Sequence, residues 1–358
     1  MKPIVGVNYY LSKKDYDDAV FLDKYNENPC SPFLRKFKRW MELHYDVEIH
    51  TYDCIDVDSP SVKAVLYFDY NWRSAFSDPF LKRIPFGKRA LMLIEPANVN
   101  PTLYYIPFFR NRFKTIFTWD EKLLRNHPDY VPVNVPVGAE PSLYKENPFS
   151  NIQFSTKKLL VAISRNRWSY MPNSTYRLRK KIYSFFDKNY TADFDLFGAN
   201  WNQPAVFYEK WFGFPRYCCY RGELGGDYWN GKVAQLAKYK FAICYENNAS
   251  QPGYISEKII DCLCARCVPI YYGSKGVERR IPQECWIDAH QFRNLREMGR
   301  FLANMTSDSH AQYIDAINSF MRSKACDFFS TDHYFHTLAK GLALCPTNQN
   351  TLQPILNS

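Results

Sequence analysis

Short apolar runs alternate with amphipathic stretches along this chain. In the first part, runs rich in β-branched and aromatic residues are typical of strands. They cover residues 3–10, 46–52, 63–68, 89–95 and 114–119. Between the first two runs, residues 31–44 repeat apolar positions at helical spacing, and Ser31 before Pro32 suits the N-cap of a helix. The pattern therefore predicts strands that alternate with helices.

The same alternation begins again in the second part. Strands are predicted over 157–164, 193–198, 241–246 and 267–273, and helices over 174–189, 231–240 and 255–265. The last part predicts three helices, over 294–305, 309–323 and 330–344. Strands that alternate with helices imply mostly parallel sheets with both faces covered.

The two runs of the pattern are separated by residues 147–156, which are rich in asparagine and serine and have the composition of a linker. At 358 residues the chain is long enough for two domains. We therefore expect an α/β protein in which two Rossmann-like domains, residues 1–150 and 151–345, face a cleft. Residues 346–358 are expected to form a loose tail.

Composition and charge limit the classes of partner. Hydrophobic residues make up 46% of the chain, and the longest apolar stretch falls short of the ~20 residues that a membrane span needs. The first residues meet charge too soon for a secretory signal, so we expect a soluble chain, although an anchor outside this sequence is compatible with it. The net charge of +10, with basic clusters at 35–39 and 177–181, suits phosphate-bearing ligands, nucleic acid or an anionic membrane. Solvated helix faces remain the ordinary explanation of either cluster alone.

The eleven cysteines have no spacing typical of a disulfide framework. Cys262, Cys264 and Cys267 resemble a metal-binding run, but the first two would point to different faces of a helix. Buried thiols in a reducing compartment are therefore favoured over zinc. Of the four Asn-X-Ser/Thr sequons, which matter only in a secreted protein, Asn248 should carry no glycan because it lies in the polar loop described next.

The most informative stretch is 241–273, where a strand ends in a polar loop that leads into a helix and a second strand. Ligands of open parallel sheets bind outside the carboxyl ends of the strands. Gly253 permits a tight turn, and the start of the following helix is a natural phosphate site. Lys258 places a cation in the first turn, where the helix dipole disfavours it, and Glu257 offers a carboxylate to sugar hydroxyls. A capped helix with a Glu–Lys pair remains the alternative.

This stretch resembles the donor motif of glycosyltransferase family 10, the α1,3/α1,4-fucosyltransferases. That motif is approximately F-x-x-x-F-E-N-S, a short gap, Y-V-T-E-K, a helix, and V-P-(I/V)-Y-x-G. The chain has Phe241, Tyr245-Glu246-Asn247-Asn248, Tyr254-Ile255-Ser256-Glu257-Lys258, Val268-Pro269-Ile270-Tyr271 and Gly273. It departs from the motif by a tyrosine for the second phenylalanine, an asparagine for the serine and a serine for the threonine. Outside the C-terminal half the resemblance is thin.

The resemblance implies a fold of the GT-B type and an inverting transfer of L-fucose from GDP-fucose to a glycan hydroxyl, on N-acetylglucosamine or glucose of an oligosaccharide. The C-terminal domain would bind GDP-fucose and the N-terminal domain the acceptor. It also implies that no metal or other cofactor is required, with Mg²⁺ or Mn²⁺ at most stimulatory. The sequence "DVD" at 56–58 is a weak metal pattern in the N-terminal half.

The resemblance also implies roles for individual residues. Lys258 would pair with the pyrophosphate and Glu257 with ribose hydroxyls, while Asn247 and Tyr254 would line the nucleotide-sugar site. The family has an arginine in the helix after the first strand of the donor domain. Its R-x-x-x-Y spacing selects Arg179 here, with Arg177 as the fallback, and its expected contact is the β-phosphate.

An inverting transfer needs a base for the proton of the acceptor hydroxyl. A carboxylate near the sugar also stabilises an oxocarbenium-like transition state. Glu95 ends the apolar run 89–95 at the place where the family has this glutamate. A glutamate at a strand end is often only the first solvated residue. Asp69 and Asp120, which end neighbouring strands, are the alternatives.

Other functions remain open from the sequence. Basic clusters interleaved with aromatic residues suit a nucleic-acid-binding protein, but no nucleic-acid motif accompanies them. A sugar-binding protein without activity is disfavoured by the joint presence of the expected site residues. A relative that uses another nucleotide sugar is the nearest alternative, and the acceptor does not follow from the fold. We expect a cytoplasmic enzyme, peripheral at an anionic membrane, or a Golgi enzyme whose anchor lies outside this sequence.

Overall fold

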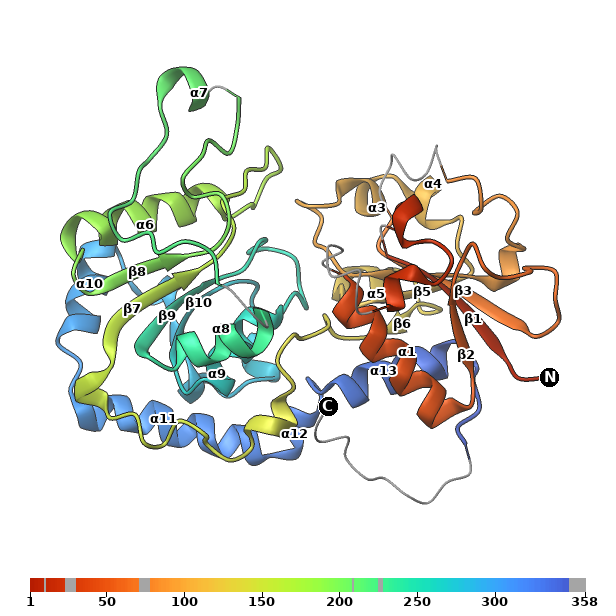
Figure 1. Ribbon diagram of the computed structural model, residues 1–358. Coiled ribbons are helices and arrows are strands. Elements are labelled where there is room, and N and C mark those ends of the chain that lie inside the picture. The colour runs from red at the N-terminus through yellow and green to blue at the C-terminus, as the bar shows by residue number, and fades with distance from the viewer. Residues whose placement is uncertain (10, 23–29, 71–77, 208, 225–227, 348–358) are drawn as a thin grey trace.

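The computed structural model describes residues 1–9, 11–22, 30–70, 78–207, 209–224 and 228–347. It contains two parallel sheets, each with helices packed against it (Figure 1). The α/β class and the two Rossmann-like units expected from the sequence are confirmed. Among the described residues, no helix is both long and apolar enough to cross a membrane.

The first sheet has the strand order β2-β1-β3-β4-β5-β6, and all its pairings are parallel. Its strands are β1 (Ile4–Asn8), β2 (Glu48–Thr51), β3 (Val62–Phe68), β4 (Arg89–Leu93), β5 (Thr115–Thr118) and β6 (Val131–Pro132). Its helices are α1 (Ser31–Tyr45), α3 (Pro101–Tyr105), α4 (Pro107–Arg110) and α5 (Glu121–Asn126). β3 and β4 are almost wholly buried, which explains why they read as continuous apolar runs.

The second sheet has the order β11-β10-β9-β7-β8, again with parallel pairings. Its strands are β7 (Lys158–Ile163), β8 (Phe194–Phe197), β9 (Tyr239–Tyr245), β10 (Val268–Tyr272) and β11 (Ile287–Asp288). The helices of this part are α6 (Tyr176–Asn189), α7 (Glu209–Phe212), α8 (Tyr228–Leu236), α9 (Glu257–Cys264), α10 (Leu295–Ala303), α11 (Ser307–Arg322) and α12 (Lys324–Asp327). The expected helix 231–240 ends early, because Tyr239 already belongs to β9.

Local sequence explains most helix ends. α1 starts at Ser31 with Pro32 in its first turn, so Ser31 lies one residue inside the predicted boundary and Cys30 is the N-cap. The Ser31 hydroxyl donates to the Val20 carbonyl, 2.5 Å away, rather than capping the helix. Proline suits this first turn because the N–H it lacks has no helical partner there.

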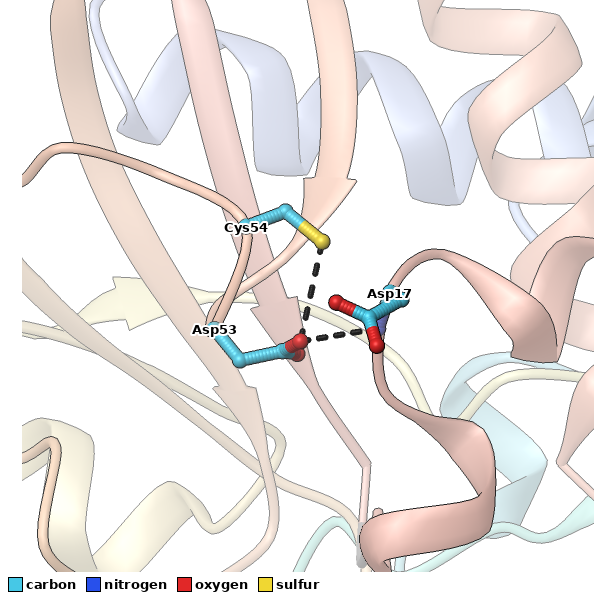
Figure 2. Close-up of side chains that lie close together, drawn as sticks. All are labelled: Asp17, Asp53 and Cys54. Carbon is cyan, nitrogen blue, oxygen red and sulfur yellow. Dashed lines mark hydrogen bonds between the residues drawn. The ribbon is translucent and has the colours of Figure 1, made fainter.

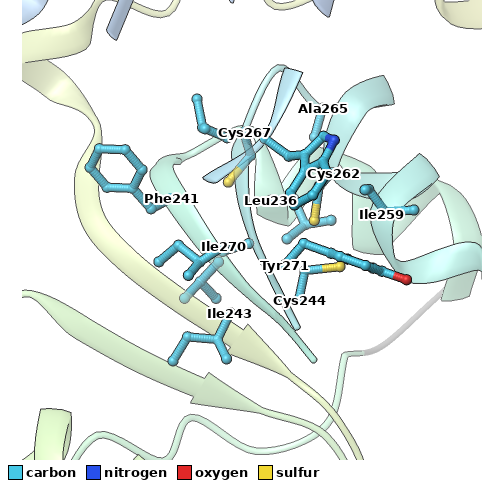
Figure 3. Packing of buried hydrophobic residues seen from close by; sticks show 14 of the residues in the cluster. Leu236, Phe241, Ile243, Cys244, Ile259, Cys262, Ala265, Cys267, Ile270 and Tyr271 are labelled. Carbon is cyan, nitrogen blue, oxygen red and sulfur yellow. The ribbon is translucent and has the colours of Figure 1, made fainter. Parts of the chain in front are cut away.

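The core of the second sheet contains several of the cysteines. Figure 3 shows Cys244, Cys262 and Cys267 packed among aliphatic and aromatic side chains such as Ile270. These thiols are buried and unpaired, and so is Cys264. Within the described residues, no candidate metal-ligand group includes any of them. The expectation that these thiols are buried is therefore confirmed.

The C-terminal helix α13 (Thr331–Gly341) returns to the first sheet (Figure 1). Its Phe335 and Leu338 belong to the same buried cluster as Phe37 and Trp40 of α1. The Trp40 indole Nε1 donates to a carboxylate oxygen of Asp332 at 2.7 Å. The chain thus connects both sheets through its last helix as well as through residues 133–157.

The expected tail, 346–358, follows this helix after the short segment 342–345. Within it, the backbone N–H of Thr347 donates to the carbonyl of His44 at 2.9 Å, at the end of α1. Residues 348–358 lie outside the described residues.

Candidate active site

Glu246 fixes the start of α9 from inside the protein. Its carboxylate is fully buried and accepts from the Ser256 backbone N–H at 2.8 Å and from the Ser256 hydroxyl at 2.6 Å. Ser256 is the N-cap, with an extended backbone, and its hydroxyl oxygen accepts from the backbone N–H of Lys258. The polar loop after β9 therefore has a structural task as well as the chemistry expected of it.

Lys258 lies among carboxylates at this helix start. Its Nζ is 3.5 Å from carboxylate oxygens of both Glu246 and Glu257. Burial disfavours the ammonium form, yet these two carboxylates raise the pKa of Lys258. Burial would also raise the pKa of Glu257, but Lys258 and Lys232 instead lower it to about 2. Both side chains are therefore charged at neutral pH, and Glu257 keeps a quarter of its side chain exposed.

A buried ion pair lies beneath this cluster. Lys232 on α8 places its Nζ 2.6 Å from a carboxylate oxygen of Asp261 and 4.0 Å from one of Glu257. Lys232 and Asp261 are almost fully enclosed. Breaking such a pair leaves an uncompensated buried charge, so the pair fixes α8 and α9 to each other. Sequence reasoning missed Lys232, because a lysine on an amphipathic helix ordinarily faces solvent.

Arg179 holds the polar loop. It is buried on α6, and its Nη2 donates to the Tyr245 carbonyl and, at 3.0 Å, to the Asn247 side-chain oxygen. The amide of Asn247 in turn donates to the Tyr254 hydroxyl at 3.4 Å. Three of the expected donor-binding residues thus form one hydrogen-bonded chain. Arg177, the fallback, is exposed and lies over the Trp168 ring, 4.5 Å from its centroid.

The same loop joins the second sheet to the first. The Tyr254 ring is buried against Trp119, with centroids 4.7 Å apart, at the carboxyl end of β5. The side-chain amide of Gln251 donates to Asp120 at 2.5 Å and its oxygen accepts from the Ala97 N–H at 2.9 Å. Residues 247–254 are called the bridging loop below. Through these contacts the loop holds the start of α9 near the turn after β4.

Glu95 lies in that turn. Its backbone N–H donates to Asp69 at 3.0 Å and its carbonyl accepts from the Tyr104 hydroxyl at 3.0 Å. In the described part of the chain its carboxylate has no hydrogen-bond partner and no ion pair. Burial raises the pKa of Glu95, although the charges of Arg167 and Lys258 act in the opposite direction. A half-buried carboxylate with a raised pKa has the properties of a general base.

Asp69 and Asp120, the alternatives to Glu95, instead accept hydrogen bonds from backbone N–H groups. Asp69, buried and in the left-handed region at φ 60°, accepts from the N–H groups of Ile94 and Glu95, both at 3.0 Å. Asp120 caps α5 through the N–H groups of Lys122 and Leu123 and also accepts from Gln251. Their oxygens are therefore occupied by structural hydrogen bonds.

Arg167 was missed by sequence reasoning. It follows β7, and its charge acts on Glu95 across the two sheets. The same segment is tied to the turn after β4, because the Ser169 hydroxyl donates to the Asn98 carbonyl at 2.8 Å. The sequence signal that could have identified Arg167 is a basic residue after the carboxyl end of a predicted parallel strand.

A group of possible metal ligands lies elsewhere. Among the described residues, Asp17, Asp53 and Cys54 place one ligand atom each within 4.8 Å of the others (Figure 2). The Asp17 N–H donates to Asp53 at 2.8 Å. Asp53 and Cys54 follow the edge strand β2, which β1 and β3 separate from β4 and Glu95, and Asp17 comes from the segment between β1 and α1. Asp56 and Asp58 are not part of it.

Comparison with known families bears on the second sheet. Residues 219–333 match the model described as "Glycosyltransferase family 10 (fucosyltransferase) C-term". The resemblance to family 10 is confirmed for this part of the chain. The match includes Asn247, Tyr254, Glu257 and Lys258 and leaves Glu95 and Arg179 outside.

Two characterised relatives support the same family. An α-(1,3)-fucosyltransferase of Helicobacter pylori is 33% identical over 97 residues, which is 27% of this chain and 20% of the relative. An α-(1,4)-fucosyltransferase of Arabidopsis thaliana is 30% identical over 73 residues, 20% of this chain and 18% of the relative. The matched segments thus span about a fifth of each relative's length.

Solved structures resemble the whole fold. An α1,3-fucosyltransferase with GDP has a TM-score of 0.50 at 14% identity and covers 98% of this chain and 92% of its own. A DNA-modifying β-glucosyltransferase has a TM-score of 0.59 at 11% identity and covers 96% and 100%. At such identities the likeness concerns the fold, and it confirms the expected GT-B type.

Proposed function

We propose that this chain is an inverting glycosyltransferase that moves L-fucose from GDP-fucose to a glycan hydroxyl. The observation that carries the proposal is the carboxylate of Glu95, which accepts no hydrogen bond from any described residue, has a raised pKa and lies across from the charged start of α9. The bridging loop holds the start of α9 near the turn that carries Glu95. The family match supports fucose as the sugar, because it covers this helix start.

In the proposed reaction, the acceptor oxygen attacks the anomeric carbon of fucose from the side opposite to GDP. The bond from that carbon to the β-phosphate oxygen breaks, and its electron pair leaves with GDP. The acceptor proton passes to Glu95, and the negative carboxylate stabilises positive charge on the sugar as the bond breaks.

The charged groups around α9 suit a diphosphate. Lys258 and the N-terminus of α9 would neutralise it, and Arg179 would meet the β-phosphate as charge develops there. Glu257, ionised and a quarter exposed, would accept hydroxyl hydrogen bonds from the ribose. Asn247 and Tyr254 would line the site. These cations make a metal dispensable, so we propose that no cofactor is required and that Mg²⁺ or Mn²⁺ is at most stimulatory.

The acceptor is proposed to bind beside the first sheet and to be an oligosaccharide with N-acetylglucosamine or glucose. Peripheral attachment to an anionic membrane is proposed from the +10 charge. A cytoplasmic location is proposed because a glycan on Asn248 would not fit. That side chain is buried and accepts from Ser250 at 2.9 Å.

The direct test measures GDP release from GDP-fucose with a panel of glycan acceptors, with and without excess chelator. GDP-mannose serves as the donor control. We expect release only with GDP-fucose and a suitable acceptor, unaffected by the chelator, with the product of opposite anomeric configuration. Release only from another nucleotide sugar would assign the same site to a different donor. Strong loss with chelator that manganese restores would contradict the metal-free mechanism.

A further inference from the structure

A cavity of about 1070 Å³ lies in the second half of the protein, and no residue of the bridging loop lines it. Its walls come from α6, from the ends of β9 and β10, and from the segment that leads into α10. In Figure 1, α10 lies at the side of the second sheet that is remote from the first sheet. Cavities of this size hold small molecules.

The cavity and the candidate active site use different side chains of α6. At about 100° per residue, Lys181 lies nearly opposite to Arg179 around α6, while Leu178 and Phe185 lie roughly 100° and 120° from it. Lys181, Leu178 and Phe185 line the cavity, while Arg179 contacts the bridging loop. The two sites meet only at Tyr245, whose carbonyl accepts from Arg179 and which also lines the cavity, so we treat the cavity as a second site.

One wall is a ladder of stacked rings. Tyr245 and Tyr272 stack with centroids 4.9 Å apart and planes at 24°, and Tyr272 and His290 stack at 4.3 Å and 20°. All three line the cavity, and exposure increases along the ladder from buried Tyr245 to His290, whose side chain is 48% exposed. A further planar ring could continue such a stack, whereas a saturated sugar ring could not do so to the same extent.

The cations that line the cavity favour a negatively charged ligand. Lys181, Arg296 and Arg300 line the cavity, and within the described residues none of them forms an ion pair. Arg293 is paired with Glu297 at 3.3 Å, and this glutamate is the cavity's only acidic lining residue in the described chain. Arginine guanidinium groups bind phosphate oxygens in pairs, and the N-terminus of α10 adds positive potential.

We propose that this cavity binds a nucleotide, with the base stacked on the ladder of Tyr245, Tyr272 and His290 and the phosphates held by Lys181, Arg296 and Arg300. The ladder of rings favours a ligand with a planar ring. The cations that form no ion pair with the described residues favour a ligand with several negative charges. The site goes beyond the proposed transfer reaction and does not depend on it.

The test uses calorimetry with ATP, adenosine and inorganic phosphate as probes. It is done on the full chain and repeated with Lys258→Ala, which on the proposed function weakens nucleotide binding at the candidate active site only. We expect one saturable ATP site in both proteins. Adenosine and phosphate should each bind at least about tenfold more weakly than ATP, because adenosine lacks the phosphates and inorganic phosphate lacks the base. Arg296→Ala combined with Arg300→Ala should weaken ATP by at least about tenfold.

Two further variants make the test specific. Lys188→Ala is the matched control for Lys181→Ala, because both lysines are exposed on α6 and only Lys181 lines the cavity. Lys188→Ala should leave ATP binding unchanged and Lys181→Ala should weaken it. His290→Ala changes an exposed ring, so it should fold and should weaken ATP but not phosphate.

Three results would overturn the proposal. One is the absence of saturable ATP binding to the full chain, and another is phosphate affinity equal to that of ATP, which would leave an anion site without base recognition. The third is much tighter, steeply salt-dependent binding of a single-stranded oligonucleotide, which would make the cavity part of a nucleic-acid groove.

Discussion

At the scale of single residues, the carboxylates that follow the neighbouring strands β3 and β4 have different tasks. Asp69 uses both oxygens to hold the backbone N–H groups of Ile94 and Glu95. Glu95 is held by its backbone, so its own carboxylate remains available. A base positioned in this way needs no side-chain partner that would compete for the proton.

Glu95→Gln keeps the size and hydrogen-bonding capacity of the side chain but cannot take a proton. We expect fucose transfer to fall by about 10² or more, the usual scale for loss of a general base, while GDP affinity and melting temperature stay close to those of the parent. Asp69→Asn is the control, and it should lower the melting temperature because a buried acceptor of two backbone N–H groups is altered. Near-normal transfer by Glu95→Gln would exclude Glu95 as the base.

The raised pKa of Glu95 also predicts a pH dependence. A base works in its deprotonated form, so transfer should fall as the pH drops through the pKa of Glu95. Because burial raises that pKa, the fall should occur above the ordinary carboxylate range, near 4.3. The profile of kcat/KM against pH measures it, and an acid limb at or below about 4.3 would contradict the assignment.

Two arginines of α6 offer a matched pair for the donor site. Arg179→Ala removes a buried cation and its hydrogen bond to Asn247, so both GDP binding and transfer should fall by about tenfold or more, as for the loss of charge-assisted hydrogen bonds. Arg177→Ala changes an exposed side chain and should leave GDP affinity within about twofold. Calorimetry with GDP compares them, and the reverse order of effects would place the phosphate contact at Arg177.

At the same scale, the sequence predicted residue types better than their tasks. All three carboxylates Glu95, Asp69 and Asp120 end apolar runs, and only the resemblance to the family favoured Glu95 over the other two. The structural roles of Asp69 and Asp120 did not follow from the sequence, because non-local packing decides which backbone groups their side chains meet. Arg167 was missed for the same reason, since its effect on Glu95 depends on two segments that are far apart along the chain.

At the scale of elements, the bridging loop connects the two sheets at its glycine. Gly253 has φ +87°, and a Cβ there would collide with the Trp119 carbonyl oxygen and crowd the Glu121 side chain. The loop also accepts the Glu121 N–H through the Pro252 carbonyl at 3.1 Å. Gly253 therefore permits both the turn and the close approach of β5.

Gly253→Ala should lower the free energy of unfolding by about 1–3 kcal/mol through backbone strain and displacement of β5. Transfer should fall as well, because the loop also positions Asn247 and the start of α9. Gly87→Ala is the control, since no atom lies within 4 Å of a Cβ at that position and its φ is not positive. Chemical denaturation compares the two, and equal stabilities would show that the loop has room to yield.

The strand–loop–helix–strand segment 241–273 was predicted nearly residue by residue, because local signals agree there. Apolar runs define β9 and β10, and Ser256 caps α9 as its sequence context suggests. The boundary of α8 was placed too late, since "YK" at 239–240 suits the end of a helix or the start of a strand equally well. The long helices of the last part were also predicted, because their apolar period is regular.

At the scale of the whole molecule, the last helix belongs to the first core. Periodicity predicted a helix at 330–344, yet nothing local indicated that α13 would pack on α1 and not on the second sheet. The partner of an amphipathic helix depends on which apolar surface is left uncovered after both sheets form. Our division into residues 1–150 and 151–345 thus remains a prediction about folding units, and α13 supplies a test of their independence.

Phe335 is the residue on which that test depends. It is fully buried, and its ring lies edge-on to Phe37 and Phe33 of α1, with centroids 5.2 and 5.8 Å apart. Phe335→Ala should lower the free energy of unfolding by about 3–5 kcal/mol, the range for large-to-small changes in a core. Phe301→Ala, on a side chain 39% exposed, should change it much less.

The region in which Phe335→Ala loses protection from hydrogen exchange shows whether the two halves unfold separately or together. If α13 completes the first core, hydrogen exchange in Phe335→Ala should accelerate in β1, β3 and α1 before it does so in β9 and β10. Local opening follows the cluster that has lost its packing. Equal acceleration in both sheets would mean that the two halves unfold as one cooperative unit, and in that case residues 1–150 would not fold without the rest of the chain. Protection of α1 that is unchanged would show that the first core stands without its last helix.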